Sequence, residues 1–305
     1  MIYDVIIVGS GPAGLTAGIY GVRAGLKTLI LDSSSMTGGQ ILNTYEIDNY
    51  PALPGVSGAD LGRLMGEHCN RLGVEFARGK VTSIIDRGNT KEIITKKTTF
   101  ETKSIIIATG SSNRKLGCDG ESEFSGMGVS FCATCDGAFF KDKVVAVVGG
   151  GDVALEDAIY LARTCEKVYL IHRRDEFRGA KVLQDAVKNC ANIEIIYDSI
   201  VEQISGEMAV QSIAVRNVKT DECIDISIDG VFIAVGNIPN TSGIEGLPNM
   251  DSAGYIIAGE DCATSIPGIY AAGDVRTKQL RQVITATADG ANAITSVCTY
   301  LQDMI

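Results

Sequence analysis

The chain has 305 residues, of which 45% are hydrophobic and 21% are charged, so it can form one or two soluble domains with sizeable cores. Its formal net charge of −10 at neutral pH argues against nucleic acid as a partner. No apolar run reaches the ~18–20 residues of a membrane span, so we expect no membrane partner either.

Short runs rich in Val and Ile recur along the chain, and helical stretches separate several of them. Many runs are nearly continuous rather than alternating, which is typical of strands buried on both faces. Helices are predicted at Pro12–Ala24, closed by Gly25, and at Asp152–Thr164. The strand–helix–strand order predicts α/β architecture with parallel sheets. The predicted strands include Val5–Val8, Thr28–Leu31, Ser104–Ala108, Val144–Val148, Val168–Ile171, Ile193–Tyr197, Val231–Val235 and Ile269–Ala272.

A glycine-rich loop follows the first predicted strand, with the spacing Gly9-x-Gly11-x-x-Gly14. Gly9 permits the tight turn, Gly11 lets a pyrophosphate approach the backbone, and Gly14 lets helix and strand pack closely. The helix N-terminus then presents free N–H groups to the phosphates. Asp32, at the end of the next strand, is placed to accept hydrogen bonds from a ribose diol. The segment therefore predicts a dinucleotide site, and the alternative is a merely tight turn.

Cys132 and Cys135 form a C-x-x-C pair, whereas the other seven of the nine cysteines lack motif spacing. Zinc usually takes four ligands, and with only His68 and His172 as histidines a redox-active disulfide is favoured over a metal site. Asp136 follows the pair and could protonate a released thiolate; the alternative is a turn or N-cap residue. The scattered cysteines predict reduced thiols in a cytoplasmic protein. Because Met1 leads directly into a predicted strand, we expect no signal peptide.

A second glycine loop repeats the first, with the spacing Gly149-x-Gly151-x-x-Ala154. Each loop opens a strand–helix–strand unit, so we expect two nucleotide-binding domains. No low-complexity linker separates them, and Ser111–Gly117 and Gly236–Gly243 are the candidate hinges.

A basic cluster follows the next strand, at the position where an NAD site has an acidic residue. His172 or Arg173 occupies that position, and guanidinium groups bind a 2′-phosphate through charge-assisted hydrogen bonds. Arg174 and Arg178 are four residues apart and would share a face if the segment coils. The cluster therefore predicts that the second loop binds NADP(H). The alternative is an ordinary solvated turn, which the two acidic residues inside the cluster would fit. His172 as a metal ligand or a catalytic base is disfavoured.

Together these motifs resemble those of low-molecular-weight thioredoxin reductases, essentially from end to end. A cysteine pair inside the second nucleotide domain is specific, because many other disulfide reductases have theirs near the N-terminus. Two departures are small: Asp32 stands where the family commonly has Glu, and Asn49–Gly55 is an altered form of a family motif. The matching segments are Gly9–Gly14, Gly38-Gly39-Gln40, Ala108-Thr109-Gly110, Cys132–Gly137, the Gly149 loop, His172–Arg178, Ala272–Arg276 and Arg281-Gln282-Val283.

The resemblance implies two Rossmann-like three-layer dinucleotide-binding domains, one inserted in the other. The FAD domain would comprise residues 1–113 and 243–305, and the NADPH domain, with the cysteine pair, residues 114–242. The implied cofactors are FAD and NADPH, the implied partner is oxidised thioredoxin, and the implied assembly is a cytoplasmic homodimer. The implied activity is transfer of electrons from NADPH through FAD and the disulfide to thioredoxin.

The resemblance also assigns roles to individual residues. Cys135 would lie nearer the flavin, Cys132 would attack thioredoxin, and Asp136 would be the acid. Asp274 would hold the ribitol chain. The implied FAD residues are Gly9, Gly11, Pro12, Ala13, Gly14, Asp32, Gly39, Gln40, Asn49, Ala108, Thr109, Gly110, Gly273, Asp274, Arg281, and, at the pyrimidine end, Gln282 and Val283. The implied NADPH residues are Gly149, Gly151, Asp152, Val153, Ala154, His172, Arg173, Arg174 and Arg178.

Alternative functions are a ferredoxin-dependent flavin thioredoxin reductase, a flavin dithiol oxidase, or a non-catalytic nucleotide-sensing protein. Relatives that use ferredoxin lack the second glycine loop and the arginine cluster. Both features are present in this chain, so NADPH is the favoured donor.

Overall fold

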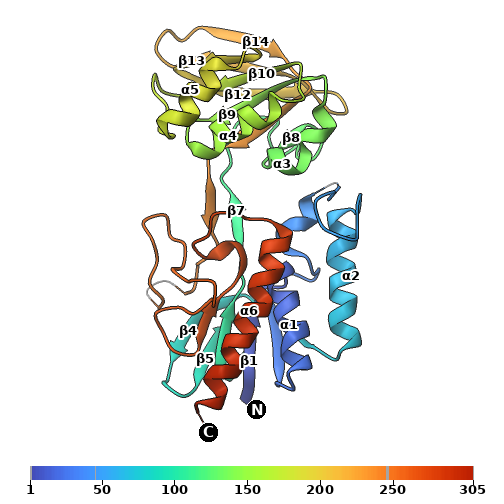
Figure 1. Cartoon of the computed structure of the whole chain (residues 1–305), viewed down its shortest axis with the longest axis vertical. Coiled ribbons are helices and arrows are strands. Elements are labelled where there is room, and N and C mark those ends of the chain that lie inside the picture. Colours follow the sequence, from blue (N-terminus) through green and yellow to red (C-terminus); the bar gives the residue numbers. More distant parts are fainter. Residues whose placement is uncertain (1, 45, 245–246, 305) are drawn as a thin grey trace. The chain divides into compact units, whose positions relative to one another are not determined.

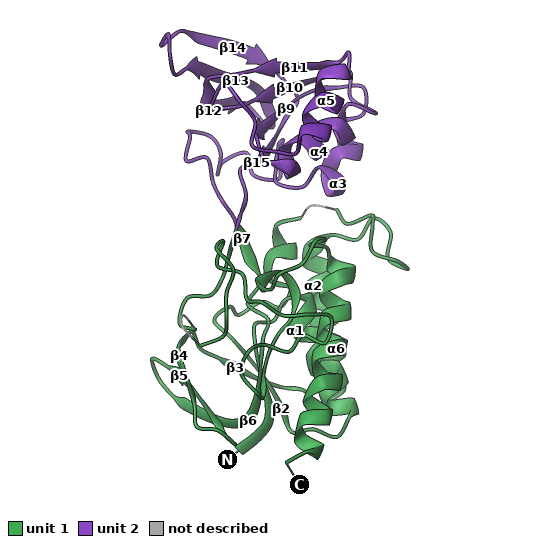
Figure 2. Cartoon of the chain, turned by 60° about the vertical axis from the view of Figure 1, so that its left-hand side comes forward, with its two compact units in different colours: residues 1–112, 238–305 green, residues 113–237 purple. Residues whose placement is uncertain are grey.

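The computed structural model describes residues 2–44, 46–244 and 247–304. The chain forms two compact units (Figure 2): unit 1 is Met1–Ser112 with Ile238–Ile305, and unit 2 is Asn113–Asn237. Strands β7 (Ser111–Asn113) and β16 (Asn237–Pro239), where the chain passes between units, pair into a two-stranded sheet. No helix in these described ranges is long and apolar enough to span a bilayer.

Unit 1 contains a seven-stranded sheet with the order β3-β2-β1-β6-β5-β4, and β17 pairs with β6. Its β1, β2, β3, β6 and β17 are parallel, and β4 and β5 are antiparallel additions. Val5, Ile6 and Ile7 at the centre of β1 are fully buried, as the continuous apolar run predicts. The strands are β1 (Ile2–Val8), β2 (Thr28–Asp32), β3 (Glu75–Arg78), β4 (Val81–Asp86), β5 (Lys91–Thr95), β6 (Thr99–Ile107) and β17 (Ile269–Ala271).

Helix α6 lies against α1 in unit 1 (Figure 1). The two backbones approach so closely that a Cβ atom at Gly290 would lie 2.2 Å from the Ala13 carbonyl oxygen. Helix α1 ends one residue before the predicted limit, and Gly25, with a φ of +76°, follows its C-cap as expected. The helices are α1 (Pro12–Arg23), α2 (Gly58–Arg71) and α6 (Val283–Gln302), with short 3₁₀ turns η1 (Gly39–Asn43) and η3 (Gly273–Val275).

Unit 2 contains a parallel five-stranded sheet with the order β11-β10-β9-β15-β8. Helix α4 ends at Leu161, three residues before the predicted limit, because the following residues turn back with Thr164 N–H donating to the Leu161 carbonyl. The elements are β8 (Val129–Ser130), α3 (Ala133–Asp136), η2 (Gly137–Phe140), β9 (Val144–Gly149), α4 (Asp152–Leu161), β10 (Lys167–Ile171), α5 (Lys181–Asn189), β11 (Ile193–Ile196) and β15 (Gly230–Ala234).

Three antiparallel strands complete unit 2 and were not among the predicted strands. They are β12 (Ser199–Gly206), β13 (Val210–Asn217) and β14 (Cys223–Ser227). Their inward side chains join the apolar cluster under the parallel sheet, where Ile213 packs with Ala146 and Val231. Both units are therefore α/β folds built on a mainly parallel sheet with a glycine loop after its first long strand, which confirms the predicted fold class.

Candidate active site: a disulfide and two dinucleotide loops

The first glycine loop leaves the carboxyl end of β1 through backbone contacts that exclude side chains. Gly9 has a φ of +110°, and a Cβ atom there would lie 2.3 Å from the Ala108 carbonyl oxygen. A Cβ atom at Gly14 would lie 1.9 Å from the Gly9 carbonyl oxygen. Gly11 differs, because the nearest atom to its missing Cβ is the Gly38 carbonyl oxygen at 3.9 Å. The loop is thus tightly packed at Gly9 and Gly14 and open at Gly11, which leaves room for a phosphate to approach the backbone.

Other predicted residues of unit 1 surround this loop. Gly38 N–H donates to the Ser10 carbonyl oxygen at 2.8 Å, and a Cβ atom at Gly39 would lie 3.1 Å from Gly11 Cα. The Asp32 carboxylate accepts from the Ser10 N–H at 2.6 Å and from its hydroxyl at 2.7 Å. Asp32 therefore fixes the loop itself, a contact that the ribose prediction did not anticipate.

The segment after β17 contains two buried polar atoms, on Asp274 and Arg281. Asp274 Oδ1 and Arg281 Nε are buried and have no hydrogen-bond partner among the described residues. Burial raises the pKa of the Asp274 carboxyl, and the nearby charges of Lys278 and Arg281 partly oppose that shift. Buried polar groups without partners are uncommon in proteins. A ligand rich in hydroxyl groups would supply the missing contacts, so these residues fit a flavin ribitol chain.

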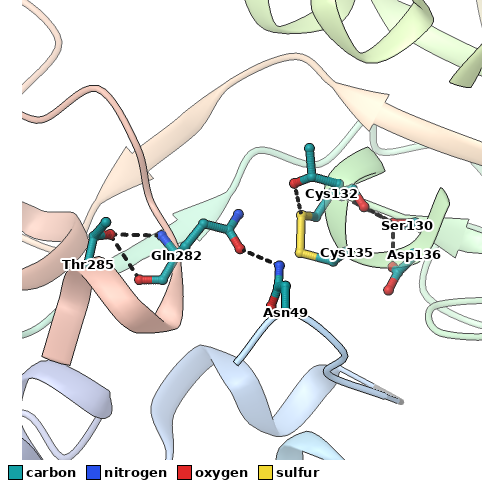
Figure 3. The surroundings of a disulfide bond; sticks show 8 residues. Asn49, Ser130, Cys132, Cys135, Asp136, Gln282 and Thr285 are labelled. Atoms are coloured by element: carbon teal, nitrogen blue, oxygen red, sulfur yellow. Dashed lines mark hydrogen bonds between the residues drawn. A yellow bond between two sulfur atoms is a disulfide. The ribbon is translucent and has the colours of Figure 1, made fainter. Parts of the chain in front are cut away.

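Gln282 is the N-cap of α6 and belongs to a capping box with Thr285. Its Oε1 also accepts a hydrogen bond from Asn49 Nδ2 at 3.0 Å (Figure 3). The capping box starts the helix at Val283, and the hydrogen bond from Asn49 connects this helix terminus to the segment that contains Asn49.

The cysteine pair of unit 2 is bonded, with Cα atoms 5.3 Å apart. Cys132 is the N-cap of the short helix α3, and both cysteines are partly exposed. The Ser130 hydroxyl accepts from the Cys132 N–H at 3.1 Å and donates to Asp136 Oδ2 at 2.6 Å (Figure 3). Ser130 therefore connects the disulfide backbone to the predicted acid.

Asp136 is mostly enclosed by protein atoms. Burial raises the pKa of its carboxyl, and the hydrogen bond from Ser130 only partly lowers it. A raised pKa keeps the carboxyl protonated to a higher pH than usual, which suits a general acid.

The second glycine loop repeats the features of the first. A Cβ atom at Gly149 would lie 2.4 Å from the Ala234 carbonyl oxygen and 2.6 Å from Ala154 Cβ, whereas Gly151 has nothing within 4 Å of its missing Cβ. Asp152 Oδ1 accepts from the Ala180 N–H at 2.6 Å, and the Val153 side chain is exposed. The open face at Gly151 again fits a nucleotide phosphate.

The basic segment after β10 is anchored to this loop through His172 and Gly150. The His172 ring is buried, its Nε2 lies 3.0 Å from the Glu176 carbonyl oxygen, and it fills the space where Gly150 has no side chain. Burial is the main cause that lowers the pKa of His172, so the ring is neutral near pH 7. The Arg178 N–H donates to the Gly150 carbonyl oxygen at 2.8 Å. The His172 ring thus packs against the second glycine loop at Gly150.

The three arginines of the segment are placed differently. Arg173, Arg174 and Arg178 are exposed, and within the described ranges no hydrogen bond or ion pair occupies their guanidinium groups. The segment is a series of bends rather than a helix, so the helical spacing proposed for Arg174 and Arg178 does not apply. Free guanidinium groups beside an open glycine loop fit an additional phosphate.

Sequence reasoning missed several residues that organise the site. No sequence motif identifies Ser130. Asn240 exchanges hydrogen bonds with Thr109 through its backbone oxygen and side-chain amide. Asp289 is a buried carboxylate on α6 that contacts Arg276 and Lys278. A single acidic residue on the Ala- and Gly-rich face of α6 was the one available signal for Asp289.

Two open dinucleotide loops in separate units, one of which also contains a disulfide, define a nucleotide-dependent disulfide oxidoreductase. The sequence matches the pyridine nucleotide-disulphide oxidoreductase family over residues 3–290, and the chain belongs to that family. The family uses a flavin and a nicotinamide cofactor.

Similar proteins narrow the class further. A thioredoxin reductase from Listeria monocytogenes is 44% identical over 305 residues, covering 99% of this chain and 95% of the relative. One from Bacillus subtilis is 40% identical, with 99% and 96% covered. The crystal structure of thioredoxin reductase from Streptococcus pyogenes is 44% identical, covers 99% of both chains and has a TM-score of 0.94. The chain is thus similar to low-molecular-weight thioredoxin reductases along its whole length.

The glycines of the first loop give separable predictions for folding and binding. Gly14→Ala should destabilise unit 1 by about 1–3 kcal/mol, because its Cβ atom would overlap the Gly9 carbonyl. Gly11→Ala should unfold at the wild-type temperature, because its Cβ atom has room, yet retain less flavin after purification. Thermal unfolding of the apoproteins and the flavin-to-protein absorbance ratio measure the two effects. Equal flavin content in Gly11→Ala and wild type would contradict a phosphate at Gly11.

Proposed function

We propose that this chain is an NADPH-dependent thioredoxin-disulfide reductase that uses FAD. The observation that carries the proposal is the partly exposed Cys132–Cys135 disulfide on the same unit as an open glycine loop and three exposed arginines. Similarity to thioredoxin reductases over the full chain supports oxidised thioredoxin as the substrate. The arginines favour NADPH over NADH as the electron donor.

The residues of unit 1 would hold FAD, so residues 1–113 and 243–305 would be the FAD domain. Gly11 would face the pyrophosphate and Asp274 would accept hydrogen bonds from the ribitol chain. Residues 114–242 would be the NADPH domain, with Arg173, Arg174 and Arg178 on the 2′-phosphate. FAD held by these residues would supply the two-electron chemistry that connects hydride transfer from the nicotinamide to reduction of the Cys132–Cys135 disulfide.

The thiols then perform disulfide exchange. The Cys132 thiolate attacks one sulfur of the thioredoxin disulfide, breaking that S–S bond and forming a mixed disulfide. Cys135 attacks the Cys132 sulfur, which restores the Cys132–Cys135 bond and releases reduced thioredoxin. Asp136 donates a proton to a thiolate that leaves, and its raised pKa keeps that proton available.

The domain order adds a geometric requirement. Both the thiols and the nucleotide loop with the arginines belong to unit 2, and both have to reach one flavin in unit 1. We infer rotation of one domain against the other about the connecting segments Ser111–Gly117 and Gly236–Gly243. A cytoplasmic homodimer is proposed on the family resemblance.

Asp136→Asn should lower thioredoxin turnover by about 10²-fold, within the usual contribution of a general acid. Because the protonated carboxyl is the active form, the wild-type rate should fall as pH rises through the raised pKa of Asp136. The variant should lack that fall in kcat/KM between acidic and alkaline pH. Ser130→Ala, which removes the hydrogen bond that lowers the pKa, should move the fall to higher pH. An unchanged profile in both variants would exclude Asp136 as the acid.

A steady-state assay tests the proposed function. Purified holoenzyme with oxidised thioredoxin should oxidise NADPH and produce one equivalent of reduced thioredoxin for each NADPH. NADH and reduced ferredoxin are the comparison donors. Turnover with reduced ferredoxin and none with NADPH would instead support the ferredoxin-dependent alternative.

A further inference from the structure

Asp289 is a buried carboxylate that the proposed chemistry does not use. It lies on the second turn of α6 among small residues, and its side chain is 6% exposed. An ionised carboxylate in such a setting needs compensating donors. Burial would raise the pKa of Asp289, but hydrogen bonds from Arg276 and Lys278 outweigh burial and hold it below the ordinary value. Asp289 is therefore ionised at neutral pH.

Four hydrogen bonds converge on this carboxylate from one short segment. Gly273 N–H, Arg276 Nε and Lys278 Nζ each donate to Asp289 Oδ2 at 2.8 Å, and Arg276 Nη2 donates to Oδ1 at 2.7 Å. Asp274 lies in the same segment, between Gly273 on one side and Arg276 and Lys278 on the other. Asp289 thus attaches the backbone on both sides of Asp274 to helix α6.

The segment has little freedom apart from this attachment. Gly273 has a φ of +78°, and a Cβ atom there would lie 3.0 Å from Ala13 Cβ. Arg276 Nη1 donates to the carbonyl oxygens of Ala258 at 3.2 Å and Thr277 at 3.0 Å. The orientation of Asp274, whose Oδ1 has no partner among the described residues, is therefore set by the contacts of its neighbours.

The cluster also has a fixed net charge. Arg276 and Lys278 contribute two positive charges and Asp289 one negative charge, so one positive charge remains in a site where the three side chains are 6–11% exposed. Charges in such enclosed positions are weakly screened. The charge of Lys278 reaches Asp274, because it opposes the rise in the pKa of that carboxyl.

We propose that Asp289 is a positioning residue for the flavin, which fixes the segment that presents Asp274 and sets the net positive charge beside it. The inference rests on the proposed flavin site in unit 1. Reduction adds negative charge to a flavin, so positive charge nearby favours the reduced form and raises the midpoint potential.

Two substitutions change the cluster charge in opposite directions. Asp289→Asn makes the net charge +2, and it should raise the flavin midpoint potential and weaken FAD binding to the apoprotein by about tenfold. Lys278→Gln makes the net charge zero while Arg276 still pairs with Asp289, and it should lower the potential. Shifts of the midpoint potential in opposite directions would indicate a charge effect. Simple loss of structure would not raise the potential in one variant and lower it in the other.

Asp4→Asn is the matched control in the same unit. Asp4 accepts hydrogen bonds from Lys27 N–H at 2.9 Å and Lys103 Nζ at 2.8 Å, near the start of β1 and away from the Gly9 end. It should change neither FAD affinity nor midpoint potential. Asp274→Ala tests the proposed flavin site itself and should lose FAD.

FAD titration of each apoprotein by flavin fluorescence and spectroelectrochemistry of each holoprotein give the two readouts. Wild-type affinity and potential in Asp289→Asn, together with loss of FAD in Asp274→Ala, would overturn the positioning role alone. Full FAD binding by Asp274→Ala would instead overturn the flavin site and the inference with it. If Asp289→Asn does not fold, Lys278→Gln decides, since an unchanged or raised potential there contradicts the inference.

Discussion

Cys135→Ser is expected to stop thioredoxin turnover while NADPH still reduces the flavin. Without Cys135 no Cys132–Cys135 disulfide forms, so the two electrons of the reduced flavin have no disulfide to reduce. The fall in kcat should exceed about 10³-fold, because the residue belongs to the covalent pathway rather than assisting it. Anaerobic stopped-flow absorbance at the flavin band measures the first half-reaction, and thioredoxin reduction measures the second.

Two controls accompany this variant. Cys223→Ser, an exposed free cysteine on β14 of the same unit, should leave both half-reactions at wild-type rates. Cys132→Ser should also block turnover, but only Cys135→Ser retains the thiol that forms the mixed disulfide. Thioredoxin reduction by Cys135→Ser at the wild-type rate would show that the assigned thiol pathway is wrong.

Replacing Arg173 and Arg178 together by alanine should reduce kcat/KM for NADPH by about 10²–10³-fold and leave that for NADH within a few-fold. Charge-assisted hydrogen bonds contribute roughly 1.5–3 kcal/mol each, and about 1.4 kcal/mol corresponds to tenfold in affinity. Both guanidinium groups are exposed and have no hydrogen-bond or ion-pair partner among the residues that the structure describes, so the loss should leave folding intact. Initial rates with each nucleotide, at fixed ionic strength, measure the change in preference.

Arg163→Ala is the matched control, because Arg163 is exposed just after the end of α4 in the same unit. It removes a positive charge without touching the loop, and the ratio of kcat/KM for NADPH to that for NADH should stay constant. An equal fall for both nucleotides in the double variant would contradict a 2′-phosphate contact.

The sequence predicts the glycine loops well because their requirements are local. Gly9 needs a positive φ. Within its own strand–helix unit, a Cβ atom at Gly14 would overlap the Gly9 carbonyl and one at Gly149 would overlap Ala154 Cβ. The continuous apolar runs that form β1 and β9 are equally local signals. The cysteine pair is likewise defined by its own spacing.

Features that depend on distant contacts were missed or misplaced. Exposed or half-buried positions interrupt the buried ones in β12 and β13, and β14 buries Ile226 among exposed residues, so these strands lack the continuous runs that marked the parallel strands. His172 is buried because the ring fills the space over Gly150, which lies 22 positions earlier, and no local pattern indicates that contact. Asp289 obtains its donors from a segment before α6, so only the tertiary fold brings them together.

An anaerobic titration tests most directly the claim that electrons pass from NADPH through the flavin and the Cys132–Cys135 disulfide to thioredoxin. Holoenzyme is titrated with NADPH while the flavin band is followed, and oxidised thioredoxin is then added. The account predicts bleaching of the band by NADPH and its full return on addition of thioredoxin, with the return absent in Cys135→Ser. A flavin band that NADPH leaves unchanged, or one that thioredoxin fails to restore, would contradict the account.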